Sequence, residues 1–134
     1  MEQTSAVNAI PQSFPKSARL LKRADFLRVY ESGRRHFGSH MTFFYLDRKP
    51  AGAGEVPAPG RPRVGFTVSR ALGGSVERNR IRRRVREAVR MNLAGLQRAV
   101  DVVINPKRSA AKAALPVLLA EVAKGFAVIE RGGK

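Results

Sequence analysis

Seven arginines crowd into thirteen consecutive positions, residues 78–90, which read RNRIRRRVREAVR. Apolar residues also recur here at helical spacing and fall within one narrow stripe of a helical wheel. The stripe consists of Ile81, Val85, Ala88, Val89 and Leu96. Like charges four residues apart destabilise an isolated helix, so this segment needs a core beneath its apolar stripe. The sequence therefore predicts a helix from an N-cap at Ser75 to about residues 93–98, packed on a folded domain.

The overall charge points to the kind of partner. The chain of 134 residues has 26 Lys and Arg against 10 Asp and Glu, a net charge of +16, and 43% of its residues are hydrophobic. A folded domain with this charge favours phosphate-rich polymers or an anionic surface. The absence of cysteine excludes a disulfide scaffold, a thiolate zinc site and a cysteine nucleophile.

The N-terminal region carries an acid at Glu2 and no long apolar run, which is unlike a secretory signal. No apolar stretch approaches the roughly 20 residues that cross a bilayer. The sequence therefore predicts a cytoplasmic protein with no membrane partner.

One domain is expected between less ordered segments. Residues 1–16 are predicted to form a disordered or extended arm, and residues 131–134 a tail. Between them, 17–130 is predicted to be a single α/β domain. It is interrupted at 49–62 by a segment rich in proline and glycine, which predicts a flexible loop.

Periodicity predicts a fold that mixes helices and strands. Besides the arginine-rich helix, we expect a helix over 22–32, strands over 41–46, 63–69 and 101–104, and a last helix that begins near Pro116. Gly33 is expected to end the first helix in the left-handed conformation. The order is α-β-β-α-β-α, with room for one more strand. It indicates an α+β fold, a compact α/β sandwich of the split βαβ, ribosomal-protein-like type around a central mixed sheet.

The strand at 41–46 is apolar on both faces. Alternation puts Thr42, Phe44 and Leu46 on one face and Met41, Phe43 and Tyr45 on the other. A sheet covered by helices on one side needs only one apolar face. Aromatic residues are buried more often than not, but an exposed one beside a basic groove can stack on an unpaired base.

The arginine-rich helix has a cationic face opposite its apolar stripe. Asn79, Arg83, Arg86 and Arg90 form one line, flanked by Arg80 and Arg82. A solvated face is one interpretation, but solvated faces usually mix both signs of charge. The guanidinium group of arginine also forms paired hydrogen bonds with phosphate oxygens or stacks on a base, so a nucleic-acid partner is favoured.

The sequence offers no catalytic residue and no metal site of its own. The acidic residues are scattered, with no close carboxylate pair for two-metal chemistry. His36 and His40 stand four apart without a third ligand.

Two segments together resemble a known family. RVGFTVS at 63–69, followed by VERNRIRRRVREAVR at 76–90, is similar to the signature of the bacterial ribonuclease P protein component. The resemblance extends over about residues 19–126. It implies a sandwich with a left-handed βαβ crossover, in which the protein binds a catalytic RNA and the complex removes the 5′ leader of precursor tRNA. Mg²⁺ would be held mainly by that RNA and not by the protein alone, and no obligate protein partner is expected.

The resemblance also implies site residues. Those facing the catalytic RNA would be Arg78, Asn79, Arg80, Arg82, Arg83 and Arg86, and the line continues to Arg90. Those in the groove for the single-stranded leader would be Phe26, Tyr30 and Phe44. The sequence departs from the family at the turn 71–75 and at 105–108.

Three other functions are compatible with parts of this pattern. A structural RNA-binding protein of ribosomal type, with no catalytic role, would carry the same charge. A metal-dependent nuclease acting alone needs clustered acids, which the sequence lacks. A DNA-binding helix module would need a helix-turn-helix pattern or a zipper, and neither is visible.

Overall fold

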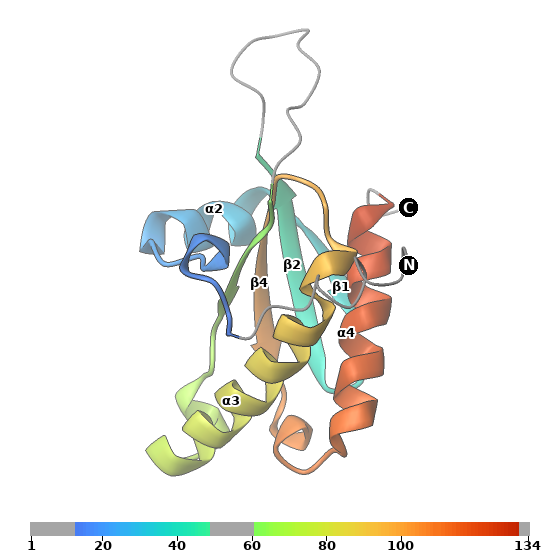
Figure 1. Cartoon of the computed structure of the whole chain (residues 1–134). Helices are drawn as coiled ribbons and strands as arrows, with labels where there is room; N and C mark the ends of the chain where they lie inside the picture. Colours follow the sequence, from blue (N-terminus) through green and yellow to red (C-terminus); the bar gives the residue numbers. More distant parts are fainter. Residues whose placement is uncertain (1–12, 49–60, 132–134) are drawn as a thin grey trace, which may run out of the picture.

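The computed structural model describes residues 13–48 and 61–131. Within these two stretches there are three α-helices and four strands: α2 (Arg23–Ser32), β1 (Arg34–Phe37), β2 (Met41–Asp47), β3 (Arg63–Phe66), α3 (Ser75–Asn92), β4 (Val100–Pro106) and α4 (Leu115–Glu130) (Figure 1). The described residues also include short 3₁₀ segments: η1 (Lys16–Ala18) before α2, and η2 (Arg70–Leu72), η3 (Leu93–Gly95) and η4 (Arg108–Ala111) between later elements.

The strands form one mixed sheet in the order β1-β2-β4-β3. β2 pairs antiparallel with both β1 and β4, while β3 and β4 are parallel neighbours. Because α3 lies between β3 and β4 in the chain, these three elements form a βαβ unit. The mixed α+β architecture expected from the sequence is confirmed, and β1 is the extra strand. The left-handed sense of the crossover stays a prediction.

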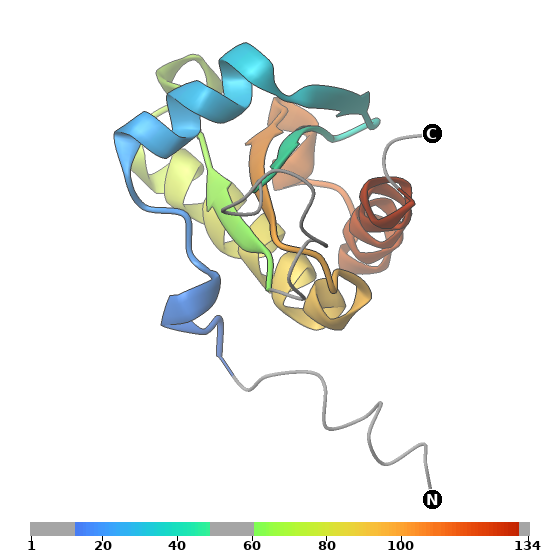
Figure 2. The ribbon, with the colours of Figure 1, turned by 90° about the horizontal axis from the view of Figure 1, so that it is seen from above.

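Helices cover both faces of this sheet. α3 and α4 pack against one face and α2 lies on the other (Figure 2). In the described part of the chain no helix is long and apolar enough to cross a membrane.

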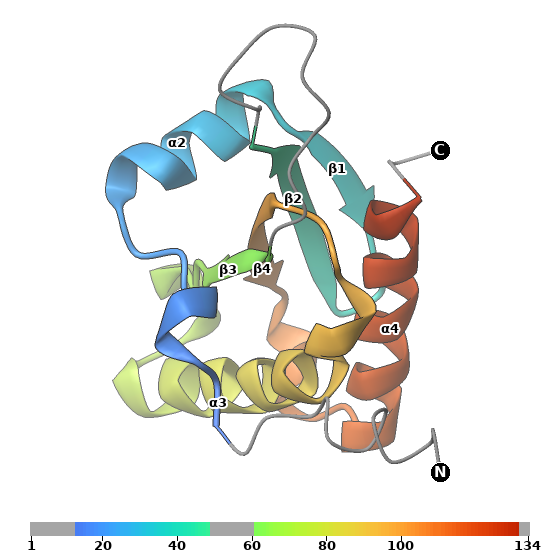
Figure 3. The same ribbon diagram turned by 45° about the horizontal axis from the view of Figure 1, so that its top comes forward.

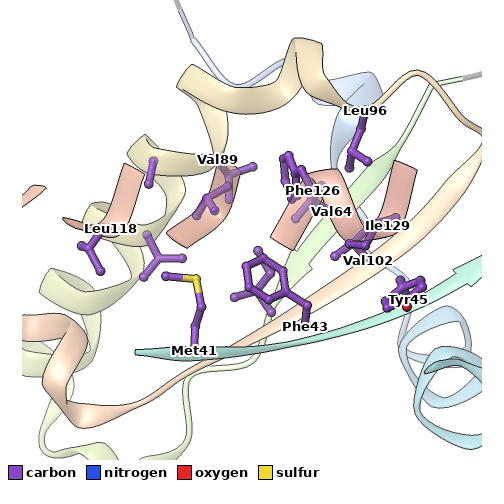
Figure 4. Close-up of a cluster of buried hydrophobic side chains, with 14 of the residues drawn as sticks. Met41, Phe43, Tyr45, Val64, Val89, Leu96, Val102, Leu118, Phe126 and Ile129 are labelled. Carbon is purple, nitrogen blue, oxygen red and sulfur yellow. The ribbon is translucent and has the colours of Figure 1, made fainter. Parts of the chain in front are cut away.

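The main core lies between the sheet and the pair α3 and α4. Met41, Phe43 and Tyr45 of β2 point into it and meet side chains of both helices (Figure 4). The apolar stripe of the arginine-rich helix is buried as expected, including Leu96 beyond the end of α3. This burial holds α3 in a helix despite its seven arginines.

A smaller core lies under α2 and explains the second apolar face of β2. Val29 of α2 is completely buried against Leu20 and Val103. The partly buried side chains around them are Phe26, Tyr30, Phe44 and Leu46. The alternation expected along β2 is therefore confirmed, and each face has its own helical cover.

Two expected helix ends are wrong in detail. Gly33 ends α2 in an extended conformation, with φ of −85°, and not in the left-handed one. A Cβ at this position would lie 2.5 Å from the Val29 carbonyl oxygen and 2.6 Å from that of Tyr45, so a close backbone approach requires the glycine. Ser75 is the first residue of α3, and the N-cap position is Gly74, without a side-chain cap.

The domain begins before residue 17, contrary to the predicted arm over 1–16. Phe14 is buried, and its ring meets Phe66 edge-on with centroids 6.0 Å apart. The 3₁₀ turn η1 follows directly. The prediction of an arm depended on the prolines in this segment. The contact of Phe14 with Phe66 nevertheless holds its last residues against the domain. The rest of that segment (1–12), most of the predicted loop (49–60) and the end of the predicted tail (132–134) lie outside the described residues.

Candidate nucleic-acid interface

The cations of α3 face outward because its apolar residues are committed to the core. Asn79, Arg80 and Arg83 are exposed. Arg78, Arg82, Arg86 and Arg90 are half-buried along the flanks of the helix. Successive turns of one helix therefore present a continuous cationic ridge, which we define as residues 78–80, 82, 83 and 86.

Few groups of this ridge are neutralised within the protein. Arg82 donates to Oδ1 of Asn79 at 2.6 Å, and Arg78 donates to the Gly73 carbonyl at 3.2 Å. Neither partner carries a charge. Among the described residues, Arg80 and Arg83 have no side-chain partner. Their guanidinium groups are therefore free to bind an external anion.

Two arginines of α3 differ from the rest. Arg90 forms an ion pair with Glu87 at 2.6 Å, and its hydrogen bond lowers the pKa of that carboxyl. The role of Arg90 in RNA binding stays a prediction. Part of its positive charge is already balanced by Glu87. Arg84 points to η4 and donates to the carbonyls of Ala110 and Ala113. The helical wheel already leaves Arg84 outside the cationic line, and this contact with η4 agrees with that.

The three aromatic residues predicted for the leader lie together on the α2 face of the sheet. The rings of Tyr30 and Phe44 meet edge-on, with centroids 4.9 Å apart. The Tyr30 hydroxyl donates to Oδ1 of Asn105 at 2.9 Å and lies 2.7 Å from the Thr67 hydroxyl. Phe26 lies over Gly65 of β3. All three rings are partly exposed, so they line a surface and do not merely fill the core.

A hollow of about 260 Å³ lies between Phe26 and the cationic ridge. Phe26 and Phe66 line it together with Arg82 and Arg86 of α3. The guanidinium of Arg86 lies over the Phe14 ring, 5.4 Å from its centroid. Arg19 also lines the hollow, and its buried Nε has no hydrogen-bond partner among the described residues. Positive charge and aromatic surface therefore meet at one place.

A buried carboxylate at the other end of the α2 face was not identified from the sequence. Asp101 of β4 is 1% exposed. Arg48 and Arg63 each contact it, with shortest distances of 2.6 and 2.8 Å, and Arg28 of α2 approaches it at 3.3 Å. Burial raises the pKa of Asp101, but hydrogen bonds and charge from Arg63 and Arg48 outweigh this and bring the pKa below its ordinary value. These contacts tie α2 to β3, to β4 and to Arg48, the residue that follows β2.

Comparison with known proteins gives the family. The ribonuclease P family model matches residues 14–130. The chain belongs to the ribonuclease P protein family. The ribonuclease P protein component of Desulfovibrio desulfuricans is 37% identical over 101 residues, 75% of this chain and 72% of that protein. The one from Desulfatibacillum aliphaticivorans is 32% identical over 123 residues, 91% of this chain and 96% of that protein.

Solved structures of family members share the fold. The RNase P protein of Staphylococcus aureus superposes with a TM-score of 0.67 at 23% identity, covering 86% of this chain and 97% of that one. For the Thermotoga maritima protein the TM-score is 0.65 at 21% identity, with 84% and 96% covered. Membership implies that the chain has an RNA partner in a ribonucleoprotein.

The described residues do not fit a Mg²⁺ site on this ribonuclease P protein. They contain no group of three or more His, Cys, Asp or Glu that could hold a metal ion. His40 is 2.7 Å from the Ser109 hydroxyl, while the ring of His36 lies tilted over Phe43.

We expect Gly65→Ala to displace the Phe26 ring and to destabilise the fold. A Cβ there would lie 2.4 Å from the tip of the Phe26 ring and 3.0 Å from the Leu20 carbonyl oxygen. Overpacking of this kind costs about 1–3 kcal/mol. Urea unfolding should show a loss in that range. A free energy of unfolding equal to that of the unchanged protein would contradict this packing of Phe26.

Proposed function

We propose that this chain is the protein subunit of ribonuclease P, which binds the catalytic RNA through the cationic ridge of α3 and the 5′ leader of precursor tRNA through the aromatic face. The observation that carries the proposal is the hollow where Arg82 and Arg86 lie beside Phe26. An RNA strand bound there would contact guanidinium groups and rings at once. In this proposal the complex works in the cytoplasm on newly transcribed tRNA.

The protein's part in the reaction is binding and positioning. Arg80 and Arg83 would neutralise phosphates of the catalytic RNA, which lowers the repulsion along α3 as well as that between RNA strands. Tyr30 and Phe44 would hold unpaired leader bases by stacking. Hydrolysis would be supplied by Mg²⁺ on the RNA partner, and the protein would promote it by raising the affinity of the complex for its substrate.

Reconstitution tests this proposal. The protein is mixed with its cognate RNA subunit and a precursor tRNA at physiological Mg²⁺, and leader removal is followed over time. We expect faster cleavage at limiting substrate than with the RNA alone. Equal rates with and without protein would contradict the proposal. Co-sedimentation with ribosomal subunits after a high-salt wash, without such stimulation, would favour a structural protein of ribosomal type.

Shortening Phe44 should weaken binding only when a leader is present. Stacking on an aromatic ring contributes about 1–3 kcal/mol per base, so Phe44→Leu should reduce the affinity for leader-bearing tRNA about fivefold or more. Leucine keeps the apolar contact to Val103, so the fold should persist. Two affinities for the assembled ribonucleoprotein are measured and compared: that of precursor tRNA and that of tRNA without a leader.

The matched control is Val117→Ala, a change at a half-exposed position on α4. It should alter neither affinity. An equal loss for both RNAs in Phe44→Leu would show that Phe44 acts through the fold and not through the leader.

A further inference from the structure

The α2 face of the sheet consists of three rows of side chains that run across the strands. Residues that are direct partners in neighbouring strands point to the same face, so the rows follow from the register. The row nearest the end of β2 contains Leu46, Asp101 and Arg63. The middle row contains Arg35, Phe44, Val103 and Gly65. The last row contains Phe37, Thr42 and Asn105.

α2 covers the first two rows and leaves the last one open. Arg28 reaches Asp101 in the first row, and Phe26 lies over Gly65 in the middle row. The Tyr30 hydroxyl extends to the last row, where it donates to Asn105. Thr42 and Asn105 accordingly remain partly exposed, although each lies on an inner strand of the sheet.

The last row ends in an exposed aromatic residue at the sheet edge. Phe37 is 67% exposed, on β1, which lies beside β2 at the edge opposite β3 (Figure 3). The guanidinium of Arg35 lies over its ring at 5.6 Å from the centroid. Phe37 is diagonal to Phe44 across the β1–β2 pair, a separation of about 7–8 Å. One nucleic-acid strand can therefore contact both rings.

The chemistry of this row fits an unpaired nucleotide. An aromatic ring offers a stacking surface, and the adjacent guanidinium attracts a phosphate. Between Phe37 and Tyr30, the Asn105 amide uses one polar atom on Tyr30 and has its other polar atom without a partner among the described residues. The four residues of β1 include two arginines and no acidic residue. Their positive charge favours a nucleic-acid strand over a protein segment that contains few acidic residues.

We propose that Phe37 and Arg35 form an additional binding position for the single-stranded leader, which holds a nucleotide farther along the strand than the one at Phe44. This inference rests on the proposed function, because it extends the same leader path across the sheet. The strand would leave the Tyr30–Phe44 pair, cross Thr42 and Asn105, and stack a base at Phe37.

A series of leader lengths tests the proposal in the assembled ribonucleoprotein. Precursor tRNAs with leaders of increasing length are bound to complexes containing the unchanged protein, Phe37→Ala, Arg35→Ala, or the conservative Phe37→Tyr. We expect Phe37→Ala to reduce affinity about fivefold or more for long leaders and to leave short leaders unaffected. Phe37→Tyr should retain the affinity for long leaders. Because Phe37 is so exposed, its truncation should leave thermal unfolding unchanged.

The outcomes separate this inference from the proposed function. If the Phe37→Ala complex binds every precursor tRNA with the affinity of the unchanged complex, while Phe44→Leu still loses affinity, the additional position is wrong. The proposed leader site at Tyr30 and Phe44 is then unaffected. If the unchanged protein gains no affinity from any leader, the proposed function fails and this inference fails with it. If Phe37→Ala instead dissociates a dimer in sedimentation and leaves leader affinity intact, β1 is an interface between copies of the chain.

Discussion

Replacing Arg80 and Arg83 together by alanine is expected to reduce the affinity for the catalytic RNA about 20-fold at 0.15 M salt. Both side chains are exposed and, among the described residues, without a partner. If each neutralises one phosphate, the slope of log affinity against log salt becomes shallower by about 1.5. Arg86 is kept, because its guanidinium packs on Phe14 and its loss would also disturb the core.

The measurement is a salt titration of binding between the protein and the RNA subunit without precursor tRNA. A matched control removes two cations elsewhere, at the exposed Lys124 and Arg131 on and beyond α4. The control should lose a little affinity at every salt concentration, because its net charge is lower. The slope of log affinity against log salt should stay unchanged. An Arg80→Ala and Arg83→Ala protein with an unchanged slope would show that the cationic ridge does not contact phosphates.

The parts of this molecule that depend on local pattern could be predicted from sequence. The apolar stripe placed α3 and its arginines correctly, because a helix that buries one stripe must expose the opposite face. The same reasoning placed Phe43 and Phe44 on opposite faces of β2, because side chains alternate along a strand. Both predictions depend only on residues close together in the chain.

What could not be predicted depends on contacts between distant segments. The partners of Asp101 are Arg28, Arg48 and Arg63, which stand 73, 53 and 38 residues away. The segment DVVI looks like an ordinary buried strand, and nothing local shows which arginines reach its first residue. β1 was missed for a similar reason: two of its four residues, RRHF, are charged, and pairing with β2 makes it a strand.

Replacing Asp101 by asparagine is expected to destabilise the fold by about 2–4 kcal/mol. Removing one partner of a buried ion pair costs about 3–5 kcal/mol when the remaining charge is left unpaired in the interior. Here the arginines are partly exposed, so the loss should fall below the upper end of such effects. Asp47→Asn is the matched control, because Asp47 pairs with Arg98 at the surface and is 56% exposed. Its loss should stay below about 1 kcal/mol.

The pH dependence of unfolding distinguishes lost charge from lost packing. The pKa of Asp101 is lower in the folded than in the unfolded chain, where the ordinary value is about 3.9. Its stabilising effect is therefore complete above that value and is lost as the pH falls through the folded pKa. Urea unfolding of the unchanged protein should thus lose stability below about pH 4. Asp101→Asn should lose less over the same interval, so the two curves should converge in acid. Parallel curves would mean that Asp101 stabilises the domain by packing, and that its three arginines do not hold α2 by charge.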